Sequence, residues 1–207
     1  MAGLTFDPVK HRYFLDAIPL PSITGVIAAA GLSDYSGIPE AVLRRKQQLG
    51  KAVHLAACFV DKGTLDWASV HPDTVPYIKA YESFIKKTGF SPLFAEQPLA
   101  SKRLRFAGTP DRLGLLYGKH AIVEIKCSVN IEPAAAYQTA AQAILVEENK
   151  LVPKVKVRYA LHLKPDASYK LVPFKDATDR FTFVAALHLF HIRSVNGQIK
   201  ENDSWKL

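Results

Sequence analysis

The sequence predicts an α/β protein in which helices flank a central mixed β-sheet, and three observations support this fold class. Helical patterns fill most of the first 90 residues. Short apolar runs separated by turn residues follow over residues 93–126. After a further helical segment and two more apolar runs, a strongly apolar helical pattern closes the chain. Strands placed between helices in this way are typical of one sheet enclosed by helical layers.

The first 90 residues are predicted to form a hairpin and three helices. The segment Asp7-Pro8-Val9-Lys10 lies between two short apolar runs, which is the pattern of a turn joining two strands. Pro21 and Ser22 precede the first helix and Gly31 ends it, while Gly89 closes the third. The expected strands cover residues 4–6 and 12–15, and the expected helices cover residues 23–30, 40–62 and 72–87.

The rest of the chain begins with a meander of three or four strands and ends with a helix. Pro133 stands where helices favour proline, so a helix is predicted to begin there. The expected strands include residues 113–117, 121–126, 155–163 and 169–172, and the expected helices are residues 133–149 and 181–193.

Composition restricts the class of protein. The 207 residues are 48 % apolar and 22 % charged, an ordinary globular mixture that excludes fibrous and disordered architectures. The 27 Lys and Arg against 19 Asp and Glu leave a formal charge of +8, which favours an anionic partner such as nucleic acid. The sequence contains no run of ~18 apolar residues, so no membrane-spanning helix is predicted. Cys58 and Cys127 are too few for a disulfide framework, so a reducing cytoplasm is expected.

Two short segments concentrate charged residues in the predicted meander: Gly108-Thr-Pro-Asp111 and Glu124-Ile-Lys126. If residues 117–120 or 118–119 form the turn, Asp111 lies opposite Lys126 and Leu113 lies opposite Glu124. The two carboxylates and the lysine then project from one face of the sheet. A slip by one residue would separate them.

Two carboxylates and a lysine on one face of a buried sheet are costly unless they are paired or bind a metal. Carboxylate oxygens suit a hard divalent ion such as Mg²⁺ or Mn²⁺. The alternative is a surface hairpin whose charges face water, and the spacing alone does not decide between the two.

An upstream helix carries a further candidate, His54, in the segment Gly50-Lys-Ala-Val-His54. Helical spacing places Gln47, Gly50 and Lys51 on the same face as His54. That face offers an amide, a cation, an imidazole and a small residue that permits close approach. A lone histidine on a helix is more often structural, so the neighbouring motifs carry its assignment as a ligand.

Together these motifs resemble the PD-(D/E)XK nuclease superfamily, and specifically its RecB-type exonuclease branch. That branch has a Gly-x-x-Asp strand, an acidic-x-Lys strand, a Gln-x-x-x-Tyr helix and an upstream helix with a metal-binding histidine. The matching segments here are Gly108 to Asp111, Glu124 to Lys126, Gln138 and His54. The resemblance spans residues 50–142 and implies a restriction-endonuclease-like core.

The sequence departs from the family at two points. Gln142 replaces the tyrosine of the helical motif, which leaves the role of that position open. Two cysteines also exclude the four-cysteine iron–sulfur cluster of some relatives. The resemblance is therefore to the cluster-free form, and it implies one nuclease domain over residues 1–207. The hairpin and first helices would occupy residues 1–90, the catalytic core about 91–175 and the closing helix 176–195.

The resemblance implies a divalent-metal-dependent DNA exonuclease that hydrolyses phosphodiester bonds and leaves 5′-phosphates. Lys126 would orient or help deprotonate the attacking water, and Gln138 would position Lys126. The implied catalytic residues are Asp111, Glu124, Lys126 and Gln138. The implied ligands of one or two Mg²⁺ or Mn²⁺ ions are His54, Asp111, Glu124 and the backbone carbonyl of Ile125.

The same resemblance implies a biological setting. The protein would act on single-stranded DNA or duplex ends during phage or bacterial recombination, repair or end-processing. A single-strand annealing or recombination protein and further copies of the chain are the expected partners. Two alternatives stay open. One is a non-catalytic DNA- or partner-binding module on the same fold, which the replacement of the family tyrosine by Gln142 leaves possible. The other is a structure-specific endonuclease.

Further residues are candidates for substrate or second-metal contacts. Glu96 precedes the meander, where relatives often place an acidic residue, but it could equally be a solvated strand end. A basic run that includes Arg44 and Arg45 lies two to three turns before His54 and could follow a DNA backbone or simply face water. These candidates are Glu96, Lys51, Gln142, Arg44 and Arg45.

Two histidines on the closing helix form a different kind of candidate. His188 and His191 are spaced to form a metal pair, but no further ligand is evident and both are expected to be partly buried packing residues.

Overall fold

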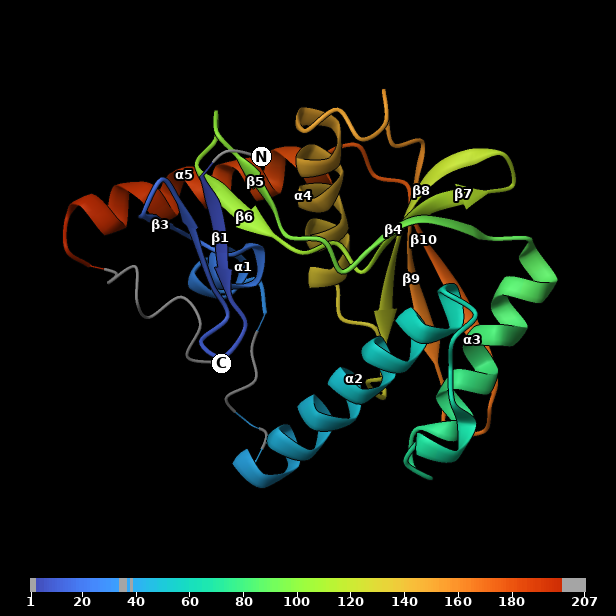
Figure 1. The fold of residues 1–207 in the computed structure, drawn as a ribbon. Coiled ribbons are helices and arrows are strands. Elements are labelled where there is room, and N and C mark those ends of the chain that lie inside the picture. The colour runs from blue at the N-terminus through green and yellow to red at the C-terminus, as the bar shows by residue number, and fades with distance from the viewer. Residues whose placement is uncertain (1–2, 34–36, 38, 199–207) are drawn as a thin grey trace.

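A computed structural model describes residues 3–33, 37 and 39–198 of the chain. Its centre is a five-stranded sheet with the strand order β10-β9-β8-β7-β4 (Figure 1). Strands β8 and β9 are parallel, and the other neighbours are antiparallel. The fold is therefore the mixed sheet flanked by helices that the sequence predicts. The strand bounds are β4 (Ser91–Ala95), β7 (Arg112–Leu116), β8 (Lys119–Lys126), β9 (Val157–Leu163) and β10 (Tyr169–Phe174).

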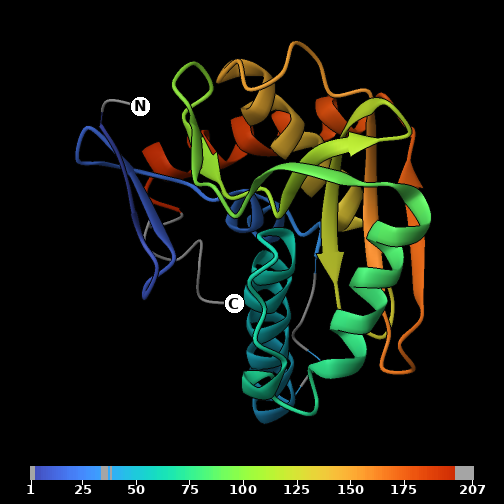
Figure 2. The same ribbon diagram turned by 45° about the vertical axis from the view of Figure 1, so that its right-hand side comes forward.

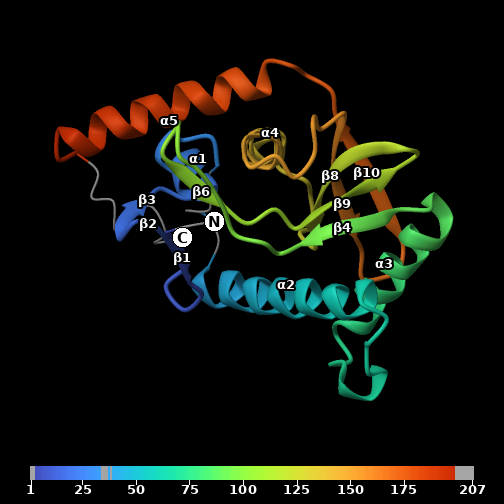
Figure 3. The ribbon, with the colours of Figure 1, turned by 45° about the horizontal axis from the view of Figure 1, so that its top comes forward.

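Helices cover both faces of the sheet (Figures 2 and 3). Side chains alternate along each strand, so neighbouring residues enter different cores. Leu113 and Ile122 pack against the first helical layer, whereas Val123 and Ile125 pack against the second. The first layer contains α1 (Ile23–Ala29), α4 (Ala134–Glu148) and α5 (Asp179–Val195), and the second contains α2 (Glu40–Asp61) and α3 (Val75–Thr88), with the short helix η1 (Trp67–Ser69) between them in the chain.

Two smaller sheets extend the molecule beside the central one. Strands β1 (Leu4–Asp7), β2 (Arg12–Leu15) and β3 (Ile18–Leu20) form an antiparallel sheet, and β5 (Leu99–Ser101) pairs with β6 (Phe106–Gly108). An apolar cluster joins the two small sheets. Its buried members are Tyr13, Leu15, Leu20, Ala100 and Ala107. The N-terminal hairpin is therefore anchored on the segment that leads from β4 to β7.

The expected helices all occur within a few residues of their predicted bounds. The meander, however, holds five strands from β4 to β8 rather than three or four, and β3 was not predicted. Strands β3, β5 and β6 have three residues each, which is too short for alternation to reveal them.

The predicted register of the β7–β8 hairpin is wrong by two residues. Leu113 pairs with Ile122 rather than Glu124, and the turn consists of Tyr117 and Gly118. Both turn residues adopt positive φ angles, 49° and 71°, as a two-residue turn that matches strand twist requires. A shift of two residues preserves the faces, so the conclusion about which side chains lie together does not depend on the error.

No helix in the described part of the chain is long and apolar enough to cross a membrane.

Candidate active site

The carboxylate of Asp111 lies directly before β7 and is buried, with 5 % of the residue exposed. Its Oδ2 accepts a 2.7 Å hydrogen bond from the backbone amide of Ile125 on β8. Continuing the β7–β8 register by one residue places Asp111 beside Glu124, whose carboxylate is also buried. Two buried carboxylates therefore meet at the same end of the hairpin.

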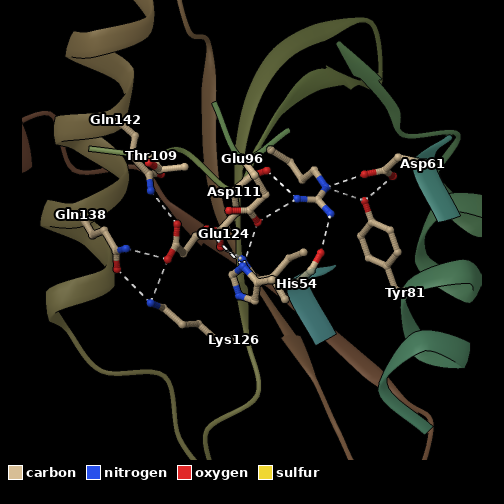
Figure 4. Close-up of polar contacts among 12 residues, drawn as sticks. His54, Asp61, Tyr81, Glu96, Thr109, Asp111, Glu124, Lys126, Gln138 and Gln142 are labelled. Atoms are coloured by element: carbon tan, nitrogen blue, oxygen red, sulfur yellow. Dashed lines mark hydrogen bonds and ion pairs between the residues drawn. The ribbon is translucent and has the colours of Figure 1, made fainter. Parts of the chain in front are cut away.

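His54 and Glu96 join Asp111 in what we call the acidic cluster (Figure 4). His54 reaches the cluster from α2, and its Nδ1 lies 2.9 Å from Glu96 Oε1 and 3.5 Å from Asp111 Oδ1. Glu96 follows β4 in a left-handed conformation with φ 49°. Its amide donates to the carbonyl of Asp111 at 3.1 Å, which ties the two backbones together.

The other half of the site is a hydrogen-bond network around Glu124, which we call the lysine network. Lys126 Nζ donates to Glu124 Oε1 and to Gln138 Oε1, both at 2.9 Å. Gln138 Nε2 donates to Glu124 Oε1 at 2.6 Å, and Gln142 Nε2 donates to Glu124 Oε2 at 2.7 Å. The two glutamines are one turn apart on α4, so this helix fixes the position of Glu124.

Arg112 supports the acidic cluster from behind and is completely buried. Its guanidinium donates to the carbonyl of Asp111 at 2.6 Å and lies 3.1 Å from Glu96 Oε1. Its Nε is 2.6 Å from Asp61 Oδ2, and Tyr81 donates to the other oxygen of Asp61 at 2.7 Å. Arg112 therefore pairs with the carboxylates of Asp61 and Glu96, and it orients the backbone carbonyl of Asp111.

Burial and nearby charges shift the pKa values of the neighbouring carboxyls Asp111 and Glu124 in opposite directions. Burial, followed by the charge of Glu124, raises the pKa of Asp111 well above its usual range. Burial would also raise the pKa of Glu124, but the Lys126 ammonium and the hydrogen bond from Gln142 outweigh it and lower that pKa. Burial would lower the pKa of His54, yet Asp111 and Glu96 raise it to about 9.

These donor atoms fit a divalent cation. One ligand atom each from His54, Glu96 and Asp111 lie within 4.8 Å of one another. An imidazole nitrogen with carboxylate oxygens suits Mn²⁺, and the oxygens suit Mg²⁺. The raised pKa of Asp111 marks negative charge that is poorly compensated without a cation. The amide hydrogen bond leaves Asp111 Oδ1 facing His54.

The structure brings most of the expected site residues together. His54, Asp111, Glu124, Lys126, Gln138 and Gln142 converge, and Glu96 joins them although its role was left open. The acidic cluster contains Glu96 rather than Glu124, and the role of Glu124 as a metal ligand stays a prediction. Ile125 contributes a backbone amide to Asp111, while a role for its carbonyl stays a prediction.

The outlying candidates do not all converge on this site. Lys51 is exposed and precedes His54 by one turn of α2. Arg44 pairs with Glu40, and Arg45 lies 3.6 Å from Asp73, so both are engaged in surface ion pairs. His191 contacts the carbonyl of Leu104, in keeping with packing, but His188 is exposed rather than partly buried.

The support that Arg112 and its partners give to the acidic cluster was not predicted from the sequence. A single arginine within the apolar run Arg112-Leu-Gly-Leu-Leu116 was a usable signal, because a charge in a buried strand needs a partner. Its partners Asp61 and Tyr81 lie on α2 and α3. No spacing rule links three such distant segments.

No family model matches the chain, and no curated protein matches it. Among solved structures, it is similar to a candidate exonuclease from Eubacterium rectale, with a TM-score of 0.50 and 11 % identity over 87 % of this chain and 83 % of that one. An alkaline exonuclease from Laribacter hongkongensis scores 0.40 at 15 % identity, covering 86 % and 94 %. The same protein in complex with dAMP scores 0.41 at 16 % identity, with equal coverage.

At these identities the likeness concerns the fold alone, and only the first of these scores is high enough to carry that argument. It supports the fold class already described, a mixed sheet between helical layers. The function has to be inferred from the side chains of this chain.

Proposed function

We propose that the protein is a divalent-metal-dependent nuclease, and more narrowly a DNA exonuclease of the RecB-type branch. The observation that carries the proposal is the convergence of His54, Asp111, Glu124 and Lys126 at one end of the β7–β8 hairpin. Buried carboxylates beside an imidazole and an ammonium suit phosphoryl chemistry, in which metal ions and cations stabilise negative charge.

In this proposal His54, Glu96 and Asp111 hold one divalent ion, and Glu124 with the Ile125 carbonyl completes that site or holds a second ion. A bound ion supplies a polarised phosphate, a water of lowered pKa and stabilisation of the leaving oxygen. Arg112 keeps Glu96 and the backbone of Asp111 in position. Tyr81 and Asp61 in turn fix Arg112.

Lys126 acts on the attacking water or the scissile phosphate. Its Nζ donates to Glu124 and Gln138, which hold it in position. Gln138 also donates to Glu124, so one amide sets the geometry of both groups. By resemblance the 3′-hydroxyl leaves and the product carries a 5′-phosphate.

The wider setting rests on the resemblance of the motifs. Residues 1–207 would form one nuclease domain that acts on single-stranded DNA or duplex ends. It would work in the cytoplasm of a bacterium or a phage-infected cell, in recombination, repair or end-processing. A single-strand annealing or recombination protein and other copies of the chain would be its partners.

The first test uses purified protein, Mg²⁺ or Mn²⁺, and linear DNA labelled at either end, beside a covalently closed circle. We expect the linear DNA to be degraded and the circle to persist, with the first label released giving the polarity. Asp111→Asn should abolish this activity. Asp166→Asn changes an exposed aspartate between β9 and β10 and serves as the matched control.

Other outcomes would redirect the assignment. Cutting of the circle, lost in Asp111→Asn, would replace the exonuclease with an endonuclease. Binding of DNA without cleavage of any substrate would support the non-catalytic module. Cleavage that survives Asp111→Asn would remove the site assignment itself.

A further inference from the structure

Strand β2, next to the tip of the β1–β2 hairpin, contacts the segment before Asp111 although it belongs to a separate small sheet. The hydroxyl of Tyr13 is 2.9 Å from Thr109 Oγ1, two residues before Asp111. Burial raises the pKa of Tyr13 to about 12, the Thr109 hydroxyl opposes this, and the charges of Glu96 and Asp111 add to it. The hairpin is thus held against the segment that carries the catalytic carboxylate.

His11 is presented at this tip in a fixed arrangement. Its ring packs edge-on against Phe6 and Tyr13, with ring centroids 5.3 and 5.5 Å apart. The carboxylate of Asp7 accepts from the amides of Val9 and Lys10 and so fixes the turn. His11 itself has a positive φ of 50°, a conformation uncommon outside glycine, and yet the residue is exposed. The turn and the ring packing therefore hold an exposed imidazole at the tip of the hairpin.

Hydrogen bonds around Tyr13 allow an arrangement of protons in which the imidazole of His11 can donate to a ligand. His11 Nε2 is 3.4 Å from the Tyr13 hydroxyl, which is in turn bonded to Thr109. If Thr109 donates to Tyr13 and Tyr13 donates to His11, the neutral imidazole carries its proton on Nδ1. The described residues offer no hydrogen-bond partner for Nδ1, so this N–H is left for a ligand.

Lys51 provides a positive charge near His11. It is exposed on α2, one turn before His54, and forms no ion pair with any described residue. Burial and the Lys51 charge lower the pKa of His11, which places the two side chains within electrostatic reach of each other. The hairpin and α2 therefore bring an imidazole and an ammonium within electrostatic reach of each other, next to the segments that carry Thr109 and His54.

A nucleic acid needs such groups at this place. The carboxylates of the acidic cluster repel a phosphodiester backbone, and lysines and N–H donors are the groups that bind phosphate in protein–DNA complexes. We propose that His11 and Lys51 form a phosphate-binding subsite that holds the DNA strand next to the scissile bond. The inference rests on the proposed nuclease function and adds to it a substrate contact outside the nuclease core.

The test compares His11→Ala and Lys51→Gln with two controls of the same residue types, His188→Ala on α5 and Lys62→Gln at the C-terminal end of α2. Both test variants should raise KM for DNA roughly tenfold with little change in kcat. The slope of log KM against log salt should fall by about 1 in Lys51→Gln, because one phosphate contact is lost. The control variants should match the wild type.

Tyr13→Phe separates a binding role from a merely structural one. The variant keeps the ring packing with Phe6 and His11 but removes the hydroxyl that orients the imidazole. We expect an intermediate rise in KM and an unchanged kcat, with a small fall in the thermal midpoint because the hydrogen bond to Thr109 is lost.

Neutral linkages identify the group that is bound. DNA is prepared with a single methylphosphonate at successive positions near the cut end. At one position the wild type should lose affinity by the same factor as Lys51→Gln, and the variant should show no further loss there. A penalty that is equal for wild type and variant at every position would overturn the subsite.

The remaining outcomes distinguish the two proposals. Cleavage by the wild type with unchanged KM and salt dependence in His11→Ala and Lys51→Gln would overturn the subsite and leave the nuclease intact. A wild-type protein that neither binds nor cuts DNA would overturn both.

Discussion

The two halves of the site solve the problem of buried charge in different ways. In the lysine network every hydrogen bond to Glu124 comes from a neighbouring side chain, and the pKa of its carboxyl is lowered mainly by Lys126 against the effect of burial. In the acidic cluster Asp111 shares its surroundings with other carboxylates, and burial raises its pKa. In one half the carboxylate of Glu124 is satisfied by neighbouring side chains, whereas the other half has a donor set that could hold a cation.

The difference suggests a division of labour. Carboxylates whose environments push their pKa values apart usually have different roles. Glu124 stays ionised and organises Lys126, Gln138 and Gln142. Asp111, with His54 and Glu96, stores unfavourable electrostatic energy that a cation would relieve. Preorganised acceptors of this kind favour tight metal binding over intrinsic stability.

The strongest test of this comparison is Asp111→Asn. We expect activity to fall by at least about 10³-fold, because the substitution removes a proposed metal ligand that would contribute several kcal/mol. Stability of the metal-free protein should stay the same or increase, since the substitution removes a carboxyl whose pKa burial has raised. Single-turnover kinetics and thermal unfolding in EDTA measure the two effects. A strongly destabilised Asp111→Asn would contradict the contrast between the halves.

The second test removes the cation that supports the acidic cluster. Arg112→Met should destabilise the protein by about 3–5 kcal/mol, because Asp61 is left as an unpaired buried charge. Activity per folded molecule should also fall, since Glu96 and the carbonyl of Asp111 lose their donor. Denaturant unfolding and assays on the folded fraction provide the readouts.

A second nearly buried ion pair, between Arg158 on β9 and Asp179 on α5, provides a comparison. The two side chains are 2.7 Å apart and neither belongs to the acidic cluster or the lysine network, although Arg158 also donates to the carbonyl of Ala136 on α4. Arg158→Met should lower stability comparably and leave activity per folded molecule unchanged. Equal loss of activity in both variants would mean that Arg112 has only a structural role.

A smaller effect is expected in the lysine network. Gln142→Leu removes the donor to Glu124 Oε2 and should cost about 1–3 kcal/mol of stability. Gln142→Tyr tests whether a hydroxyl at this position, as in the resembling family, can replace the amide. Chemical denaturation compares both with the wild type. A Gln142→Leu protein of unchanged stability would show that Glu124 does not need this donor.

Much of this fold follows from local pattern, but the site depends on tertiary structure. Helical sequence patterns locate α2 and α4, with Pro133 at the start of α4, and the alternation of β8 already places Glu124 and Lys126 on the face opposite Ile125. The register of the hairpin was not predictable, because it depends on a turn in which Tyr117 adopts a positive φ. Arg112 and its partners come from three distant segments, so only packing brings them together.

The pH dependence of metal binding separates the two halves without any substitution. A metal ligand must lose its proton, so binding to the acidic cluster releases the proton that His54 carries below its pKa of about 9. Metal affinity should therefore rise with pH, by up to about tenfold per unit between pH 7 and 9, and level off above 9. The raised pKa of Asp111 acts in the same direction. Glu124, whose pKa is lowered, adds no dependence in this range.

Isothermal titration with Mn²⁺ in buffers of different ionisation enthalpy counts the protons released. His54→Gln should bind more weakly and lose the dependence between pH 7 and 9, whereas a wild-type affinity that is flat over this range would mean that His54 does not bind the ion.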